Sequence, residues 1–251
     1  MKVLGIDVGG SGVKGAPVDL DNGELAGERH RIPTPRPATP QAVAEVVGSV
    51  AEFHGWQGPI GITVPAVVRH GIVASAANID ESWIGVDAVA LFQPHLDGPV
   101  TILNDADAAG LAESHFGAGR GAGGVVILLT FGTGIGSALI HDGRLVPNTE
   151  LGHLEFHGMD AEHYAAARLI EDPVAPISRH EWIDRVNEYL AHIDLVFSPD
   201  LVIFGGGISK NFEQFGHRLR CTAPLIPAVF RNNAGIVGAA LAAAEGELHD
   251  R

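Results

Sequence analysis

The chain of 251 residues is acidic, with a formal net charge of −14, and 46% of its residues are hydrophobic. It is long enough for one large core or two smaller ones, and its charge disfavours general binding to nucleic acid. Its single cysteine, Cys221, excludes an internal disulfide and a zinc site made of cysteines. Because it has neither a long apolar run nor a signal-peptide pattern, we expect a cytoplasmic protein.

The first part of the chain predicts an α/β series. The expected elements, in order, are strands at 3–8, 12–19 and 25–32, a helix at 41–54 after a Pro-rich loop, and strands at 59–64 and 100–103. The polar residues that open "NDADAAGLAESHFG" predict the start of a further helix.

A second series of the same kind begins with an apolar strand at 124–130. A hairpin with an Asp-Gly turn ("SALIHDGRLV"), a helix at 178–197, a strand ("DLVIFGGG") and an Ala-rich helix ("NNAGIVGAALAAAEG") follow. Helical spacing places one apolar face on the helix at 178–197, made of Trp182, Val186, Tyr189, Ile193 and Val196. The two series predict duplicated α/β lobes, with a boundary near residues 104 and 105.

Three apolar strands each lead into a glycine-rich turn. The turns are "IDVGGSGVK", "LTFGTGIGS" and "IFGGGIS". Glycine permits close backbone approach, so that successive N–H groups can point at one anion. The chain lacks the Walker P-loop pattern and the Rossmann dinucleotide fingerprint. The turns therefore predict phosphate binding of another kind.

In this order, the turns resemble the two phosphate motifs and the adenosine motif of the actin-like and sugar-kinase superfamily. "ANIDESWIG", "NDADAA", "ELGH" and "NNAGIVGAALAA" are similar to the ROK family (repressors, open reading frames, kinases). Within this family, "LLTFGTGIGSAL" and "ELGHLEFHGMDAEHYA" resemble the bacterial polyphosphate glucokinases. The resemblance implies a two-lobed actin-like/sugar-kinase fold, a duplicated ribonuclease H-like α/β fold with a central cleft. Residues 1–104 and the C-terminal helix at about 232–251 are expected to form the small N-terminal lobe, and 105–231 the larger C-terminal lobe.

The resemblance implies a sugar kinase that transfers a phosphoryl group from inorganic polyphosphate, with ATP as a further donor, to the 6-OH of glucose. It also implies Mg²⁺ as cofactor and a homodimer. The alternatives are an ATP-dependent ROK kinase for mannose, fructose or an N-acyl amino sugar, a non-catalytic sugar-sensing ROK protein, and a metal-dependent hydrolase. Family regulators carry a DNA-binding segment before the first phosphate motif, which begins here at Ile6, and this favours the kinase.

The motif matches assign residues to the phosphate donor. Asp7 is expected near Mg²⁺, directly or through water, and the Thr133 hydroxyl is expected to reach a terminal phosphate. The donor-binding residues implied by the match are Asp7, Gly9, Gly10, Ser11, Gly12, Lys14, Gly132, Thr133, Gly134, Gly205, Gly206 and Gly207. A polyphosphate chain also needs cations, and the candidates, which we expect to converge, are Lys14, Arg120, Arg144, Lys210, Arg218, Arg220 and Arg231.

Asp105 in "LNDAD" is the residue that the match selects as catalytic base, with Asp107 as its competitor. Recognition of a sugar needs buried groups that hydrogen-bond its hydroxyls. The substrate-binding residues implied by the match are Asn78, Asn104, Asp105, Glu150, His153 and Glu162.

The segment "ELGHLEFHGMDAEHYAA" is rich in histidine and acidic residues and could suggest a metal site. Many ROK proteins hold a structural zinc with this histidine, His153, and three downstream cysteines, but this chain has none of those cysteines. We therefore expect no zinc site. His157 and His163 lack a compact ligand spacing and are expected at structural or surface positions.

Overall fold

The computed structural model describes residues 1–76 and 79–249 and divides into two compact units. Unit 1 comprises Met1–Ala112 with the C-terminal segment from Asn233, and unit 2 comprises Glu113–Asn232. The division lies inside helix α3 (Asp105–His115), whereas the sequence analysis placed it at residue 104, where this helix begins.

Unit 1 is built on a mixed sheet with strand order β3-β2-β1-β5-β8, in which β4 also pairs with β2. Strand β1 is antiparallel to β2 and parallel to β5, which is parallel to β8. The bounds are β1 (Lys2–Gly9), β2 (Gly12–Asp19), β3 (Glu24–Leu25), β4 (His30–Ile32), β5 (Ile60–Val64) and β8 (Val100–Asn104).

The single strand predicted at 25–32 is wrong, because two short strands occupy this range. Strand β3 pairs with one end of β2, where Leu25 faces Val18, and β4 pairs with the other end, where Ile32 faces Val13. The residues between them bend without strand pairing. In place of one continuous strand, two short strands therefore pair with β2 at its two ends.

Successive side chains along β1 and β5 point to opposite faces of this sheet. Leu4 and Ile6 face a core that includes α1 (Pro40–Phe53), whose N-terminus is capped by the Thr39 side chain, and α2 (Ala88–Phe92). On the other face, α7 (Ala234–His249) lies directly on the backbone, because a Cβ at Gly61 would sit 1.8 Å from the carbonyl oxygen of Ala239.

Several short elements of unit 1 were not predicted. They are the hairpin β6 (Val68–Arg69) and β7 (Ile72–Val73), helix α2, and 3-10 turns at Glu81–Trp83 and Gln93–His95. Trp83 is fully buried and donates its indole N–H to the Ala38 carbonyl at 2.9 Å. This bond anchors the 3-10 turn to the loop that precedes α1.

Unit 2 repeats the layout of unit 1, with strand order β11-β10-β9-β14-β15. An antiparallel hairpin of β9 and β10 is again followed by parallel strands. The bounds are β9 (Val125–Phe131), β10 (Ile135–His141), β11 (Arg144–Val146), β14 (Leu201–Gly205) and β15 (Leu225–Pro227). The duplication that the sequence predicted is present in the two sheets.

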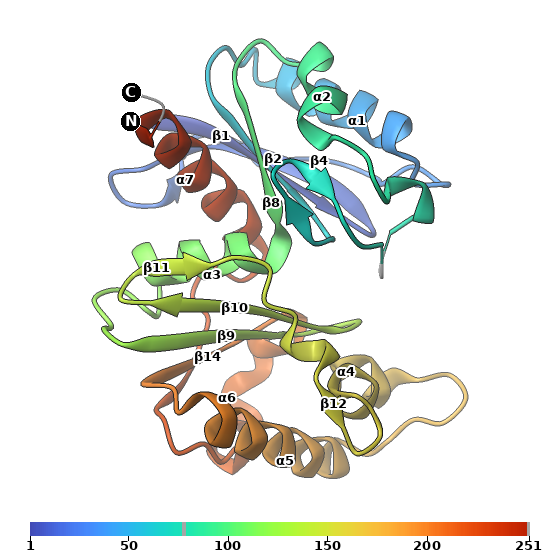
Figure 1. Ribbon diagram of the computed structural model, residues 1–251, viewed down its shortest axis with the longest axis vertical. Helices are drawn as coiled ribbons and strands as arrows, with labels where there is room; N and C mark the ends of the chain where they lie inside the picture. The colour runs from blue at the N-terminus through green and yellow to red at the C-terminus, as the bar shows by residue number, and fades with distance from the viewer. Residues whose placement is uncertain (77–78, 250–251) are drawn as a thin grey trace. The chain divides into compact units, whose positions relative to one another are not determined.

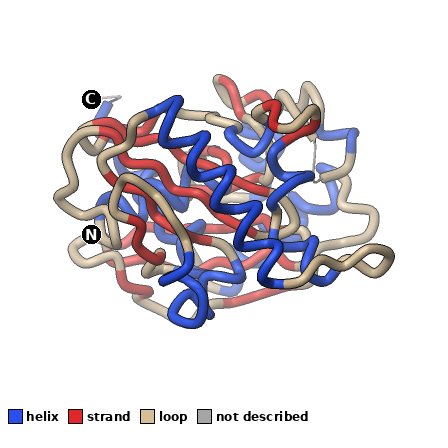
Figure 2. The backbone as a smooth tube through the Cα atoms, turned by 90° about the horizontal axis from the view of Figure 1, so that it is seen from below, coloured by secondary structure: helices blue, strands red, loops and turns tan. Residues whose placement is uncertain are grey.

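Helix α5 (Arg179–Phe197) covers one face of the unit 2 sheet (Figures 1 and 2). The Trp182 ring centroid lies 6.1 Å from that of Phe131 and 6.5 Å from that of Phe204, both on strands. Four of the five residues predicted on the apolar face are fully buried. The prediction for Val196 is wrong, because this side chain is 52% exposed. Phe197, one position later, packs against the core instead.

Shorter elements complete unit 2. They are α4 (Ala161–Ala165), α6 (Phe212–Phe215), the hairpin β12 (Glu155–Phe156) and β13 (Met159–Asp160), and 3-10 turns at Leu151–His153, Ala167–Glu171, Gly207–Asn211 and Gly216–Arg218. A last 3-10 turn at Arg231–Asn233 lies where the chain passes from unit 2 to unit 1 and leads into α7.

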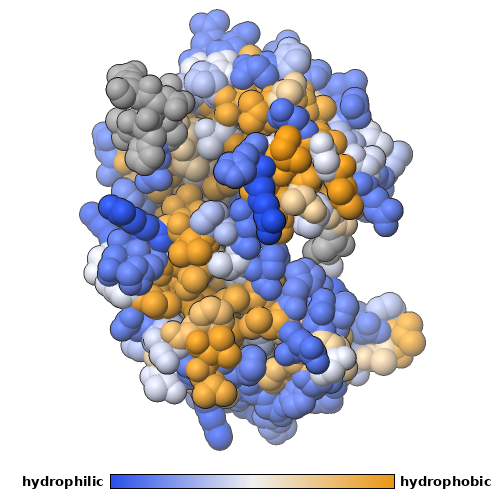
Figure 3. Space-filling view, viewed as in Figure 1, coloured by the Kyte–Doolittle hydropathy of each residue, from blue (hydrophilic) through white to orange (hydrophobic). Residues whose placement is uncertain are grey.

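Some large apolar side chains reach the surface, including Leu195, which is 80% exposed. Figure 3 shows such apolar patches among hydrophilic side chains on one face. Within residues 1–76 and 79–249, no helix combines the length and the apolar character that crossing a membrane requires.

The contact between α7 and the unit 1 sheet is tested by Gly61→Ala. The added methyl group would overlap the Ala239 carbonyl oxygen, so we expect the free energy of unfolding to fall by about 3 kcal/mol, as for overpacked cores. Urea denaturation with a constant m-value measures the loss. Gly123→Ala is the control, because its Cβ has only one neighbour, at 3.8 Å; equal effects of both substitutions would contradict the packing described.

Candidate functional site

The parallel strands of unit 1 end at one edge of the sheet, where several predicted site residues lie. Asp7 on β1 is in register with Thr63 on β5, and Asn104 on β8 is in register with Val64. Asp105 follows at the first position of α3. In open α/β sheets, ligands bind outside the carboxyl ends of the strands, so this edge is the candidate site of unit 1.

Asp7 is held by two hydrogen-bonding partners and a nearby helix. Its Oδ1 accepts from the Thr63 hydroxyl at 2.9 Å, and its Oδ2 lies 3.0 Å from Lys14 Nζ. Gly235 stands beside it at the start of α7, where a Cβ would approach the Asp7 carboxyl carbon to 2.8 Å. Both predicted donor residues therefore come together as an ion pair beneath the first glycine turn.

The first glycine turn joins β1 to β2, with Gly9 paired to Gly12. Arg31 donates to the Ser11 carbonyl at 2.6 Å and so fixes the tip of the turn. A recess of about 370 Å³ lies beside the turn and is lined in part by Gly9, Gly10, Arg36 and Asp80. The predicted sugar ligand Asn78 lies outside the described residues.

Asn104 and the two candidate bases meet at the N-terminus of α3. The Asn104 Oδ1 accepts from the backbone N–H groups of Ala106 (2.8 Å) and Asp107 (3.1 Å), and its Nδ2 donates to the Ala66 carbonyl at 3.2 Å. Asn104 thus acts as a helix cap. Asp105 is exposed whereas Asp107 is 2% exposed, so Asp105 is the carboxylate that a substrate can reach.

In unit 2, the two other glycine turns also share one sheet edge. Gly205 on β14 is in register with Thr130 on β9, so the turns at 132–134 and 205–207 follow neighbouring strand ends. Gly206 has a φ of 84° and lies so close to β9 that a Cβ would be 2.3 Å from the Phe131 carbonyl oxygen. Only glycine is compatible with this position.

Arg168 and Glu162 hold the turn at 132–134 from the other side. The Arg168 backbone N–H donates to the Gly132 carbonyl at 3.0 Å, and its guanidinium donates to the Thr133 carbonyl. Glu162 is 8% exposed and accepts from the Ile135 N–H at 3.2 Å. A Cβ at Gly134 would lie 2.3 Å from the same carboxylate oxygen, so this glycine makes room for Glu162.

The predicted sugar ligands of unit 2 interact electrostatically with one another. Burial raises the pKa of the Glu150 carboxyl, and the charge of Glu162 adds to the rise while His153 opposes it. The His153 Nε2 lies 4.0 Å from Glu150 Oε2. Glu150, His153 and Glu162 therefore form one polar cluster.

Asp160 is a member of this cluster that the sequence analysis missed. Its Oδ2 lies 2.8 Å from His153 Nδ1, and this hydrogen bond is the largest cause of the raised pKa of His153. Asp160 reaches this place because it pairs with Glu155 in the hairpin of β12 and β13. The signal in the sequence was the His-Gly turn of that hairpin, in which His157 and Gly158 both have positive φ.

The other two histidines of this segment have different neighbours, because His163 Nε2 lies 4.0 Å from Glu162 Oε1 whereas His157 pairs with Glu188. His157 Nε2 lies 3.0 Å from Glu188, which also accepts from the Tyr164 hydroxyl at 2.9 Å. His163 is exposed. Among the residues that the structure describes, no group of three or more His, Cys, Asp or Glu side chains is placed to hold a metal ion.

Comparisons with known proteins agree with this architecture. The ROK family model matches residues 3–167. The polyphosphate glucokinase of Mycobacterium tuberculosis (strain CDC 1551 / Oshkosh) is 52% identical over 249 residues, which cover 98% of this chain and 92% of that protein. The polyphosphate glucokinase of Mycobacterium leprae (strain TN) is 49% identical over 247 residues. The match covers 98% of this chain and 76% of that protein.

Solved structures share the fold. The inorganic polyphosphate/ATP-glucomannokinase of Arthrobacter sp. strain KM superposes with a TM-score of 0.92 at 49% identity, covering 98% of this chain and 99% of that chain. A ROK family glucokinase from Streptomyces griseus, solved with glucose and AMPPNP, has a TM-score of 0.82 at 25% identity, covering 98% and 100%. The expected actin-like/sugar-kinase fold is confirmed, and the chain belongs to the ROK family.

Proposed function

We propose that the chain is a polyphosphate glucokinase, which transfers a phosphoryl group from inorganic polyphosphate to the 6-OH of glucose and also accepts ATP. The observation that carries this is the identity of 52% with a polyphosphate glucokinase along 98% of the chain. The three glycine turns and the cluster of Glu150, His153 and Glu162 support it, because they supply the phosphate and hydroxyl partners that the reaction needs.

The proposed roles follow the chemistry of phosphoryl transfer. Asp105 accepts the proton of the 6-OH as the oxygen attacks the terminal phosphorus of the donor, and the donor-oxygen bond breaks as the new bond forms. The N–H groups of the glycine turns bind the phosphate oxygens. Asn104, Glu150, His153 and Glu162 bind the other sugar hydroxyls, and Asp160 fixes the His153 ring through Nδ1 so that Nε2 remains for the sugar.

Mg²⁺ is the cofactor in this proposal, and the residues present fit it. Mg²⁺ is usually bound by one or two carboxylates, several waters and the substrate phosphates rather than by an all-protein cage. Asp7 supplies such a carboxylate beside the first turn, and its two oxygens are already oriented by Thr63 and Lys14. When bound, the ion would neutralise charge on the donor phosphates.

The homodimer and the cytoplasmic location implied by the family remain part of the proposal.

The alternative of a kinase for another hexose has one observation in its favour. A structural relative with a TM-score of 0.92 is called a glucomannokinase. Mannose is therefore the second sugar to test.

The function is tested by offering the purified protein glucose and Mg²⁺ with either polyphosphate or ATP and measuring glucose 6-phosphate. We expect product from polyphosphate, and loss of product when EDTA removes the metal. Absence of product with both donors would contradict the proposed kinase. Product from ATP alone would contradict polyphosphate as donor.

The base is tested by Asp105→Asn, which keeps the shape of the side chain but cannot accept a proton. We expect kcat to fall at least about a hundredfold, the usual effect of losing a general base, with little change in glucose affinity. Asp97→Asn makes the same charge change at an exposed position of unit 1 and should leave kcat unchanged. Near-normal turnover of Asp105→Asn would mean that another group is the base.

The role of Asp160 is tested by Asp160→Asn and the NMR titration of the His153 ring. Its hydrogen bond raises the pKa of His153, so the wild-type imidazolium persists to higher pH and the substitution should lower this pKa. The pair of His153 and Asp160 stabilises the folded protein at low pH. This stabilisation is lost as the pH rises through the raised pKa of His153. Glu188→Gln, which removes the carboxylate beside His157, should not shift the His153 titration; an equal shift in both variants would refute the specific pairing.

A further inference from the structure

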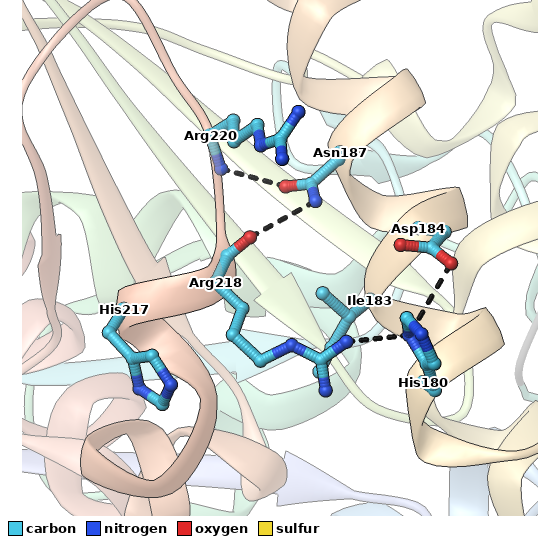
Figure 4. A pocket seen from close by; sticks show the side chains of 7 residues that line it. All are labelled: His180, Ile183, Asp184, Asn187, His217, Arg218 and Arg220. Carbon is cyan, nitrogen blue, oxygen red and sulfur yellow. Dashed lines mark hydrogen bonds and ion pairs between the residues drawn. The ribbon is translucent and has the colours of Figure 1, made fainter.

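A recess of about 520 Å³ on unit 2 gathers basic side chains away from the glycine turns (Figure 4). It lies between α5 and the chain that follows α6. Helix α5 contributes His180, Asp184 and Asn187, and the facing segment contributes His217, Arg218 and Arg220. Volumes of this size are typical of sites for small ligands.

The two arginines are placed by a backbone clamp. The Asn187 Nδ2 donates to the Arg218 carbonyl at 3.1 Å, and its Oδ1 accepts from the Arg220 N–H at 2.7 Å. Leu219 between them is extended, with φ −73° and ψ 144°, and packs against the core of unit 2. Arg218 and Arg220 are both exposed and line the recess.

The charge of these arginines is not compensated by ion pairs. In the described part of the chain, the ion pairs of lysine and arginine side chains are Lys14 with Asp7 and Arg185 with Glu181. Arg218 instead donates to His180 Nδ1 at 2.6 Å. A guanidinium has no acceptor, so this nitrogen accepts the hydrogen bond. Asp184, with Oδ2 at 3.5 Å from the same nitrogen, is the one carboxylate in the lining.

We propose that this recess binds a phosphate chain and tethers the polyphosphate donor outside the reaction site. Guanidinium groups bind phosphate oxygens in pairs of parallel hydrogen bonds, which favours phosphate over a monatomic anion. On a chain of net charge −14, a local excess of positive charge is what concentrates a polyanion, since repulsion beyond about 10 Å is screened at 0.1 M salt. The inference rests on the proposed function only for the identity of the ligand.

Two of the seven basic residues that the sequence analysis expected to converge line this recess. Lys14 belongs to unit 1, where it pairs with Asp7. The convergence of all seven residues stays a prediction.

The tether is tested by direct binding, without glucose, of orthophosphate and long-chain polyphosphate to the wild-type protein and to Arg220→Glu. Arg69→Glu, an equal charge change at an exposed position of β6, is the control. We expect Arg220→Glu to weaken the binding of the long chain about tenfold or more, the effect of losing one charge-assisted contact and reversing its charge. Arg69→Glu should have little effect, and the KM for ATP should not change in either variant.

Three results would overturn the proposed tether. Equal weakening in the two variants would show that only net charge matters. Orthophosphate binding as tight as the long chain would show a single-phosphate site, and equal binding of poly-glutamate would show that phosphate is not recognised. A wild-type protein that binds polyphosphate at this recess but does not transfer from it would refute the proposed function and leave the binding site standing.

Discussion

The candidate site of unit 2 depends on one buried carboxylate. Glu162 accepts a hydrogen bond from the Ile135 N–H, directly after the glycine turn at 132–134. The Glu162 carboxylate occupies the space that a side chain at position 134 would need, so only glycine fits there. The same carboxylate interacts electrostatically with Glu150 and His153. The glycine turn at 132–134 and a cluster suited to sugar hydroxyls are therefore fixed to each other within one unit. The partners of Glu162 include the Ile135 N–H and His163 Nε2, which lies 4.0 Å from Glu162 Oε1. A buried carboxylate is costly unless further donors complete its shell, and sugar hydroxyls are such donors.

The same sheet layout serves two different ends in the two units. Each unit has an antiparallel hairpin followed by parallel strands, and each places its glycine turn at the carboxyl edge. In unit 1 this edge carries the carboxylates Asp7 and Asp105, which suit metal and proton chemistry. In unit 2 it carries turns whose backbone N–H groups suit phosphate oxygens. The duplicated fold thus places a glycine turn at strand ends in both units, with Asp7 and Asp105 nearby in unit 1 and Glu162 nearby in unit 2.

Much of this could be predicted from the sequence, because glycine turns and apolar strands are local signals. The strands that lead into the three turns, the helix with Trp182 and the segment with Glu150 and His153 follow from spacing and motif alone. Features that depend on register could not be predicted. Asp160 reaches His153 only because a two-strand hairpin pairs it with Glu155, and β3 and β4 are separate because each finds its own end of β2. The exposed arginines at 218 and 220 likewise depend on the Asn187 clamp, for which sequence has no signature.

The central claim is that Glu162 belongs to a sugar-binding cluster built onto the donor turn. Isothermal titration calorimetry of glucose into Glu162→Gln, with exposed Glu155→Gln as control, tests it most directly. The account predicts that glucose affinity falls about tenfold or more in Glu162→Gln, as expected for losing a charged hydrogen-bond acceptor, and stays at the wild-type value in Glu155→Gln. Wild-type glucose affinity in a folded Glu162→Gln protein would contradict it.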